Sequence, residues 1–163
     1  MIVAELKSAG LRVALDDRVE VSFGRRAVEW ELKGVPVRVE IGPRDMLADQ
    51  VTLVRRDNAT KRSVPLASTV AEVTAALGAA QDALLAGAKQ FCEARTLDVE
   101  TVEDALDAGQ TGFAVVPWSV VGPEGEARLA ESAVTVRCLL HPDGRLAAAD
   151  DEPGLLAVCG RAY

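Results

Sequence analysis

The sequence predicts an α/β fold followed by a small α+β domain. Alternating apolar residues mark short strands between helical segments in the first 66 residues, and a helical apolar pattern runs over residues 67–95. Beyond residue 96 the pattern changes again, so we place a boundary near residues 95–98, between domains 1–96 and 97–163. With 163 residues, 49% of them hydrophobic, the chain can bury a core.

The first elements are expected to be a helix that Gly10 ends and a strand over residues 11–17. A helix over residues 22–33, capped by its first serine and ended by Gly34, precedes a strand over residues 35–41. A strand, a crossover helix and a second strand form an α/β unit, so these two strands are expected to be parallel.

A turn over residues 42–45, a strand over 51–56 and a second turn over 57–60 are expected next, followed by a short extended segment before Pro65. Residues 67–95 are expected to form one long helix. Its apolar residues recur at steps of three, four and seven, which predicts a stripe facing the core: Val70, Val73, Leu77, Leu84, Ala88 and Phe91.

The second domain is expected to contain two helices and three strands. Thr101 can cap a short acidic helix that ends at Gly109, and residues 123–132 are expected to form the second helix. The three strands are expected at residues 112–118, 135–140 and 155–163.

Chemistry-bearing residues are few. The one histidine, His141, lies in a Pro-Asp-Gly turn and is expected to be exposed to solvent rather than catalytic. Cys138, His141 and Cys159 could supply three zinc ligands, but a fourth is missing and apolar neighbours favour buried thiols. No catalytic residue and no metal site are predicted, because the motifs of nucleophilic, nucleotide-hydrolysing and dinucleotide-binding enzymes are also absent.

The charge distribution points to an anionic partner. The net charge is −7, yet residues 24–62 hold nine basic and six acidic side chains, a local net of +3 against −10 elsewhere. An unevenly charged, solvated surface is an equally good reading of this distribution alone. No apolar run is long enough for a membrane span, and Glu5 and Lys7 interrupt any signal peptide, so we expect a cytoplasmic protein.

Acids and bases are mixed in VEWELKGVPVRVEIGPRD at residues 28–45. Arginine donates to guanine O6 and N7, and carboxylates accept from exocyclic amines, so a mixed surface suits readout of unpaired RNA bases. The alternative is a set of surface ion pairs, each worth about 0–1 kcal/mol.

Four segments in order (LRVALDDR at 11–18, residues 24–26, WELKGVPVRVEIGPRD at 30–45 and VTLVRRD at 51–57) resemble the anticodon-binding domain of class II aminoacyl-tRNA synthetases. The likeness is greatest to the archaeal/eukaryotic-like prolyl-tRNA synthetase family. The excess of arginine over lysine and the segment GRRAVEWELKG resemble its actinobacterial members. The resemblance extends over essentially the whole chain. It implies a five-stranded mixed sheet flanked by helices, whose expected first strand is missing here.

By that resemblance the partner is the anticodon stem-loop of tRNA(Pro). Glu31 and Asp45 would accept from N1 and N2 of the two anticodon guanines, while Arg38, Arg44 and Lys61 would serve carbonyl edges and phosphates. Lys33 and Arg26 are weaker candidates by the same comparison.

The resemblance also implies what lies outside this chain. The catalytic motifs for ATP and proline are absent, so ATP and Mg²⁺ are expected to belong to the catalytic domain of a longer, homodimeric parent enzyme, and this chain alone is expected to be non-catalytic. The cysteines of the zinc site that many relatives carry are replaced, so no zinc is expected. The terminal Tyr163 would reach back toward the parent's active site.

Three hypotheses follow. The leading one is the tRNA-binding region of a prolyl-tRNA synthetase, for which Glu31→Ala or Arg44→Ala should each weaken binding by about 1–3 kcal/mol. The second is a stand-alone, non-enzymatic RNA-binding module, which the reading frame upstream of residue 1 would distinguish. The third is a structural domain, which predicts no salt-dependent RNA binding.

Overall fold

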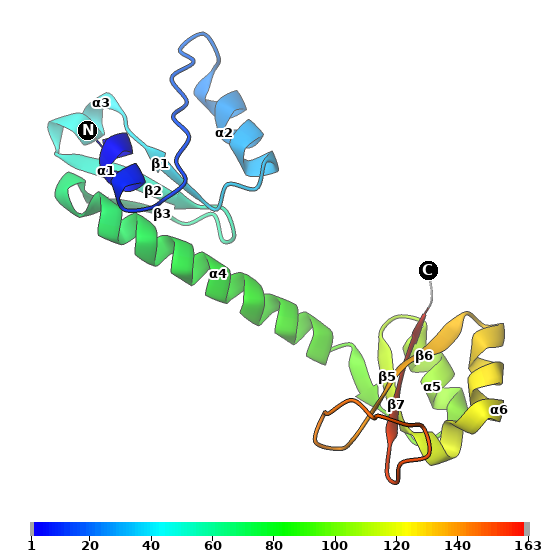
Figure 1. Ribbon diagram of the computed structural model, residues 1–163. Helices are drawn as coiled ribbons and strands as arrows, with labels where there is room; N and C mark the ends of the chain where they lie inside the picture. Colours follow the sequence, from blue (N-terminus) through cyan, green and yellow to red (C-terminus); the bar gives the residue numbers. More distant parts are fainter. Residues whose placement is uncertain (1, 162–163) are drawn as a thin grey trace. The chain divides into compact units, whose positions relative to one another are not determined.

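The computed structural model describes residues 2–161, and Tyr163 therefore lies outside the described residues (Figure 1). The chain divides into two compact units, residues 1–86 and 87–163, and each is described by itself. This division falls within the long helix, and the domain boundary near residues 95–98 stays a prediction. Within the described residues no helix is both long and apolar enough to cross a membrane.

The first unit combines short helices with a sheet, and its last helix continues into the second unit (Figure 1). In chain order the elements are α1 (Ile2–Ser8), α2 (Phe23–Leu32), β1 (Val37–Glu40), α3 (Pro43–Leu47), β2 (Gln50–Arg55), β3 (Lys61–Pro65), the 3-10 turn η1 (Leu66–Ser68) and α4 (Thr69–Glu93).

The sheet of the first unit has the order β1-β2-β3, and both pairings are antiparallel. The expected strand over residues 11–17 and its parallel pairing are wrong. No strand pairs with this segment among the described residues, and it is held instead by apolar packing of Leu11 and Val13 and by side-chain bonds to Asp16. The five-stranded sheet implied by the resemblance is therefore three-stranded in residues 2–86.

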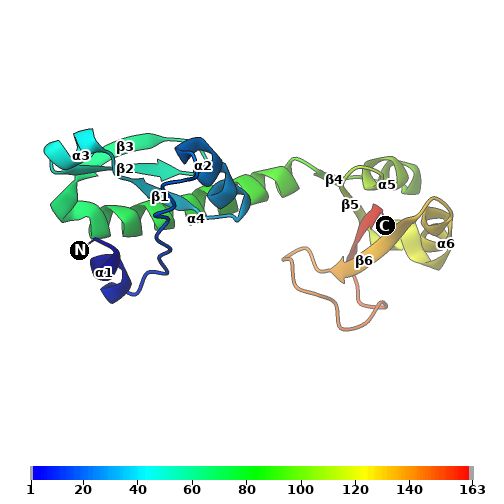
Figure 2. The same cartoon turned by 90° about the horizontal axis from the view of Figure 1, so that it is seen from above.

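One face of this sheet is the core of the first unit. Val51, Leu53 and Val64 are buried there against Leu6 of α1 and Val73 of α4. Figure 2 shows α1 and α4 on this side of the three strands. Because side chains alternate along a strand, the paired positions on the other face are mainly polar: Arg38, Glu40, Thr52, Lys61 and Ser63.

Two local predictions for the first unit need correction. The expected turn over residues 42–45 opens the short helix α3, because Pro43 occupies its first turn and Asp45 bonds back to the Gly42 N–H. The apolar stripe of α4 faces the core only in its first half, since Leu84 and Phe91 are exposed.

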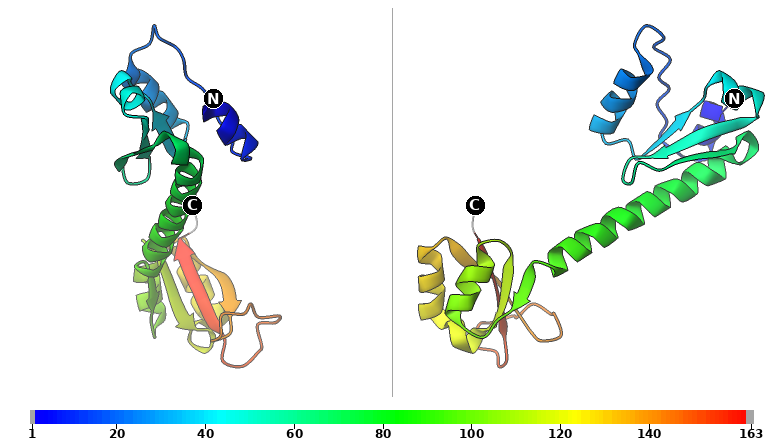
Figure 3. Two further views of the ribbon diagram at one scale, coloured as in Figure 1. Left: turned by 90° about the vertical axis from the view of Figure 1, so that its left-hand side faces the viewer. Right: turned by 180° about the vertical axis from the view of Figure 1, so that it is seen from behind.

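The second unit contains a four-stranded sheet of order β4-β5-β7-β6, in which only β4 and β5 are parallel. Helices α5 and α6 lie next to each other on one face of this sheet (Figure 3). The elements are β4 (Thr96–Asp98), α5 (Val102–Gly109), β5 (Phe113–Pro117), α6 (Trp118–Glu131), β6 (Val134–Leu140) and β7 (Leu156–Arg161).

The core of the second unit lies between these helices and the sheet. Leu129, Val116 and Val134 are fully buried in it. The predicted cap at Thr101 is confirmed, because its Oγ1 accepts a hydrogen bond of 3.1 Å from the Asp104 N–H. The strand β4 was not predicted, since three residues are too short to show a periodic pattern.

His141 and Cys159 are both largely shielded from solvent, whereas Cys92 is exposed. The expectation of an exposed His141 is wrong, because its side chain is mostly covered and its Nε2 lies 3.0 Å from Oε2 of Glu152. Cys159 is buried, and this burial raises the pKa of its thiol to about 11. Within residues 2–161 no three histidine, cysteine or acidic side chains are grouped to hold a metal ion.

Candidate nucleic-acid interface

Four charged side chains form a connected network, here called the charged strip: Glu31, Arg38, Glu40 and Lys61. Arg38 donates from Nη1 to Oε1 of Glu31 at 2.8 Å and from Nε to Oε1 of Glu40 at 2.9 Å. The second oxygen of Glu40 lies 3.7 Å from Nζ of Lys61. Three of the predicted site residues are therefore brought together, from α2, β1 and β3.

Strand geometry explains this arrangement. Arg38 and Glu40 are two residues apart in β1, so their side chains leave the same face. The register pairs Arg38 with Val54 of β2 and Val54 with Lys61 of β3. Directly paired residues point to the same side of a sheet, so Arg38 and Lys61 lie on one face. Alternating signs in neighbouring positions then allow every charge to meet an opposite one.

Arg38 is the centre of the strip and only 18% of its side chain is exposed. Partial burial opposes its charge, but the hydrogen bonds to Glu31 and Glu40 outweigh burial and raise the pKa of the guanidinium. A guanidinium has five N–H donors, and the two carboxylates use two of them. The remaining donors keep a fixed direction because the two ion pairs hold the group in place.

Asp45 lies beside the strip. Its Oδ2 accepts from the Gly42 N–H at 2.8 Å and its Oδ1 accepts from Oγ1 of Thr52 at 3.2 Å, while Thr52 is the strand partner of Glu40. Arg44, next to it in α3, is exposed, and within the described residues no carboxylate lies within ion-pair distance of it. The structure thus offers one fixed carboxylate and one unengaged arginine at this end of the sheet.

The two weaker candidates lie elsewhere. Lys33 places its ammonium 4.3 Å from the centre of the Trp30 ring, a cation–π contact at the end of α2. Arg26 belongs to a different cluster, in which it donates to the main-chain oxygen of Asp16 at 3.0 Å and lies 3.6 Å from that carboxylate. Within the described residues its Nε is buried without a hydrogen-bond partner, and both polar contacts of Arg26 are made to Asp16.

The Asp16 cluster fixes the extended segment against α2. The Asp16 carboxylate accepts two hydrogen bonds from the Arg18 guanidinium and one of 2.7 Å from Nε1 of Trp30. The bonds from Arg18 are the main reason why the pKa of Asp16 lies far below its usual range; burial opposes them, and the bond from Trp30 adds to them. Side-chain bonds here replace the main-chain ladder that a strand would have used.

The depressed pKa of Asp16 predicts a pH-dependent stability. A carboxyl whose pKa is lower in the folded state stabilises the fold above its unfolded pKa of about 3.9, and this stabilisation is lost as pH falls toward the folded value. Asp16→Asn should therefore lower the melting temperature of the first unit most at pH 7, and the difference from the parent should shrink between about pH 5 and pH 3. Melting followed by Trp30 fluorescence in a Trp118→Phe background measures this. Parallel curves for the two proteins across that pH range would contradict the prediction.

Sequence reasoning missed Glu40 and Thr52 as members of this surface. Glu40 bridges Arg38 and Lys61, and Thr52 joins the strip to Asp45. The alternation of β1 was a sufficient signal for Glu40, because it shares a face with Arg38. No local signal could find Thr52, since its place depends on the pairing of β1 with β2.

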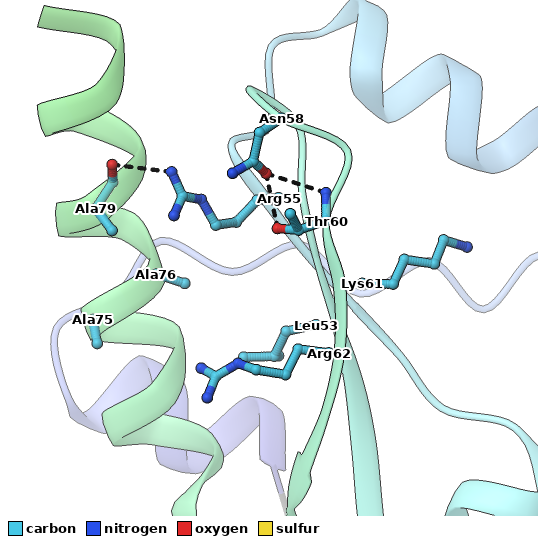
Figure 4. A pocket seen from close by; sticks show the side chains of 9 residues that line it. All are labelled: Leu53, Arg55, Asn58, Thr60, Lys61, Arg62, Ala75, Ala76 and Ala79. Carbon is cyan, nitrogen blue, oxygen red and sulfur yellow. Dashed lines mark hydrogen bonds between the residues drawn. The ribbon is translucent and has the colours of Figure 1, made fainter. Parts of the chain in front are cut away.

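A hollow of about 510 Å³ lies between the β2–β3 hairpin and α4, on the core side of the sheet (Figure 4). Both of its arginines are engaged: Arg55 with Asp57 and with the main-chain oxygen of Ala79, and Arg62 with Glu72. Figure 4 shows the side chain of Lys61 directed away from α4, while that of Arg62 is directed toward it. Lys61 is the one member of the strip that also lines this hollow, and its ammonium is directed to the opposite face, where Glu40 lies.

The model of the family described as "Anticodon binding domain" matches residues 1–76 of this chain. The chain is 55% identical to a proline–tRNA ligase of Frankia alni over 163 residues, which is 99% of this chain and 35% of that protein. It is 36% identical to the proline–tRNA ligase of Thermococcus kodakarensis over 98% of this chain and 33% of that protein.

A solved structure agrees with these relatives. The prolyl-tRNA synthetase of Cryptosporidium parvum, crystallised with L-proline and AMP, superposes with a TM-score of 0.83 at 29% identity over 99% of this chain and 36% of that chain. The α/β fold class and the likeness of the chain to prolyl-tRNA synthetases are confirmed. The chain spans about a third of the length of these relatives. The matched residues 1–76 hold all four members of the charged strip, because Lys61 is its last member along the chain.

Proposed function

We propose that the charged strip, with Asp45 and Arg44, reads the anticodon of tRNA(Pro). The observation that carries this proposal is Arg38, held between two carboxylates on the polar face of a sheet in residues that match the anticodon-binding domain family. A solvated surface of ion pairs would need neither the partial burial of Arg38 nor its two short hydrogen bonds.

The chemistry of this surface fits unpaired guanines. The half-exposed carboxylate of Glu31 can accept from guanine N1 and N2, and the free donors of Arg38 can reach O6 and N7. Lys61 and Arg44 are exposed cations that can hold phosphates, and the carboxylate of Asp45 is a second acceptor. Because the ion pairs fix Arg38 before RNA arrives, little side-chain entropy is lost on binding.

The chain would then act as the tRNA-binding part of a cytoplasmic proline–tRNA ligase, which joins proline to tRNA(Pro) with ATP. The proposal assigns ATP, Mg²⁺ and the catalytic groups to a domain outside residues 1–163, and assigns no catalytic residue to this chain. In this proposal the partner of the chain is the catalytic domain of the same enzyme, and the full enzyme is a homodimer. The identity to proline–tRNA ligases over nearly the whole chain supports this reading.

Glu31→Ala is expected to weaken binding of tRNA(Pro) by about 1–3 kcal/mol, which is about 5- to 150-fold in Kd, because one acceptor for a guanine edge is lost. Arg44→Ala is expected to weaken binding by a similar amount if Arg44 contacts a base, and to reduce the slope of affinity against salt by about one if it contacts a phosphate. Fluorescence anisotropy of labelled tRNA at several salt concentrations measures both effects.

The matched control is Glu72→Ala, which removes a carboxylate paired with arginine on the core side of the same sheet. This variant should bind tRNA(Pro) like the parent. A tRNA(Pro) with an altered anticodon should bind the parent chain more weakly than the natural one, and Glu31→Ala should reduce that difference. Equal binding of the two RNAs by the parent would overturn the proposed function.

A further inference from the structure

A second basic surface lies in the second unit, in acidic surroundings. Residues 87–163 carry 13 acidic and only six basic side chains, yet three of the six line one open hollow of about 680 Å³. Among the residues that the structure describes, no acidic one lines this hollow, here called the arginine hollow. The residues that define it are Phe91, Arg95, Gly112, Phe113, Arg137 and Arg161.

A β-bulge directs one of these arginines into the hollow. The pairing of β6 with β7 shifts between Val136 and Cys138, so that Arg137 between them has no strand partner. Bulges of this kind turn a side chain out of the regular alternation. The Arg137 guanidinium donates from Nη2 to the main-chain oxygen of Arg161 at the end of β7, which brings these two residues together.

Two aromatic rings flank the arginines. Phe113 pairs with Gly160 across β5 and β7, and a Cβ at Gly160 would come within 2.8 Å of the Phe113 ring, so this glycine gives the ring room to lie on the sheet. The Phe113 side chain nevertheless stays 40% exposed. Phe91 is 60% exposed and has the Arg95 guanidinium 3.6 Å from its ring centre.

The positive charge of the hollow is not neutralised by the described residues. Within residues 2–161 no carboxylate lies within 4.0 Å of a guanidinium nitrogen of Arg95, Arg137 or Arg161. Two other arginines of this unit do have such partners, since Arg128 meets Glu103 and Arg145 meets Asp143. The hollow therefore concentrates unpaired cations in a unit whose other charges are mainly negative.

We propose that the arginine hollow binds a nucleotide, with its phosphate on Arg137 and Arg161 and its base stacked on the exposed rings. Arginine holds phosphate through parallel N–H donors, and an aromatic face stacks on any base. An inorganic anion would not use the rings, and an apolar peptide would not use the guanidinium groups. The ligand is a nucleotide either free or within single-stranded RNA, since both offer the same phosphate and base.

This proposal does not rest on the anticodon reading. The hollow lies in residues 91–161, outside the segment that matches the anticodon-binding family and on different elements from the charged strip. It assigns a second nucleotide contact to a unit for which the first proposal names no ligand. The two can therefore fail independently.

The test is an NMR titration of the ¹⁵N-labelled chain with adenosine 5′-monophosphate and, separately, with a short single-stranded RNA. Saturable shifts are expected at main-chain amides that line the hollow, those of Thr111, Gly112 and Phe113. Arg137→Gln should weaken the fitted affinity about tenfold or more, because a charged hydrogen bond to phosphate is lost. Phe91→Leu keeps apolar bulk but removes one stacking face, and should weaken binding by several-fold.

The matched control is Arg145→Gln, which removes an exposed and acid-paired arginine of the same unit and should bind like the parent. Tighter binding of RNA than of the free nucleotide identifies an RNA strand as the source, and equal binding identifies the free nucleotide; either result supports the site. Unmoved amides at Gly112 and Phe113 with both ligands at millimolar concentration would overturn the proposal. Equal weakening by Arg145→Gln and Arg137→Gln would overturn it as well. Glu31→Ala should leave the shifts of Gly112 and Phe113 with adenosine 5′-monophosphate unchanged, which separates this result from the test of the anticodon site.

Discussion

Arg38→Met is expected to weaken binding of tRNA(Pro) by about 2–3 kcal/mol, or about 30- to 150-fold in Kd, the largest loss of any single change in the charged strip. The loss has two sources. The donors that face a guanine edge disappear, and Glu31 and Glu40 are left without their shared cation. The net charge of the surface then falls by one, and the two carboxylates repel the phosphates of the RNA. Methionine keeps part of the unbranched chain that packs on the sheet, so the fold should be retained.

The control for Arg38→Met is Arg62→Met, on the core side of the same sheet. Arg62 is paired with Glu72, which lies on α4 and not on the strip. Both variants remove one positive charge from the first unit, so a general electrostatic effect would lower both affinities equally. Site-specific reading predicts a large loss for Arg38→Met and a small, salt-dependent loss for Arg62→Met. Anisotropy titrations at two salt concentrations, with circular dichroism to confirm folding, give the comparison, and equal losses would refute the assigned role of Arg38.

The sequence predicted the parts of this site that depend on neighbours along the chain. The alternation of residues 35–41 placed the apolar and charged side chains of β1 on opposite faces, and Arg38 and Glu40 do share one face. It could not predict that Lys61 would complete the strip, because this contact depends on the register of β1 with β2 and of β2 with β3. Register is a property of strand pairing and has no local signature in a single strand.

The wrong predictions have the same origin. Residues 11–17 have the alternation of a strand, but a strand exists only where a neighbour accepts its hydrogen bonds, and none is present among residues 2–161. The apolar stripe of α4 has a helical period throughout, yet only its first half has a sheet to cover. His141 was expected in solvent because Glu152, eleven residues later, could not be recognised as its partner.

Leu129→Ala is expected to destabilise the second unit by about 3–5 kcal/mol. Leu129 is fully buried at 0% exposure and is the largest of the fully buried side chains, so its removal leaves a cavity in the middle of the core. Small domains have only about 5–15 kcal/mol of stability in total, so a loss of this size takes much of what holds the unit folded. Trp118 packs against the same core and reports its unfolding in a Trp30→Phe background.

The same variant tests whether anticodon reading needs the second unit. The core of the first unit is formed by residues 2–77 and that of the second by residues 99–159, so each cluster is buried within its own unit. Urea unfolding of Leu129→Ala should therefore show an early transition at Trp118, while Trp30, observed in a Trp118→Phe background, unfolds as in the parent.

Binding of tRNA(Pro) through the strip should persist where only the second unit is unfolded, and the nucleotide shifts of the arginine hollow should vanish. Leu97→Ala, at a side chain 52% exposed in the same unit, should change neither transition by more than about 1 kcal/mol. A single transition seen by both tryptophans would mean that the two units unfold together, and the anticodon site would then depend on a core it does not contact.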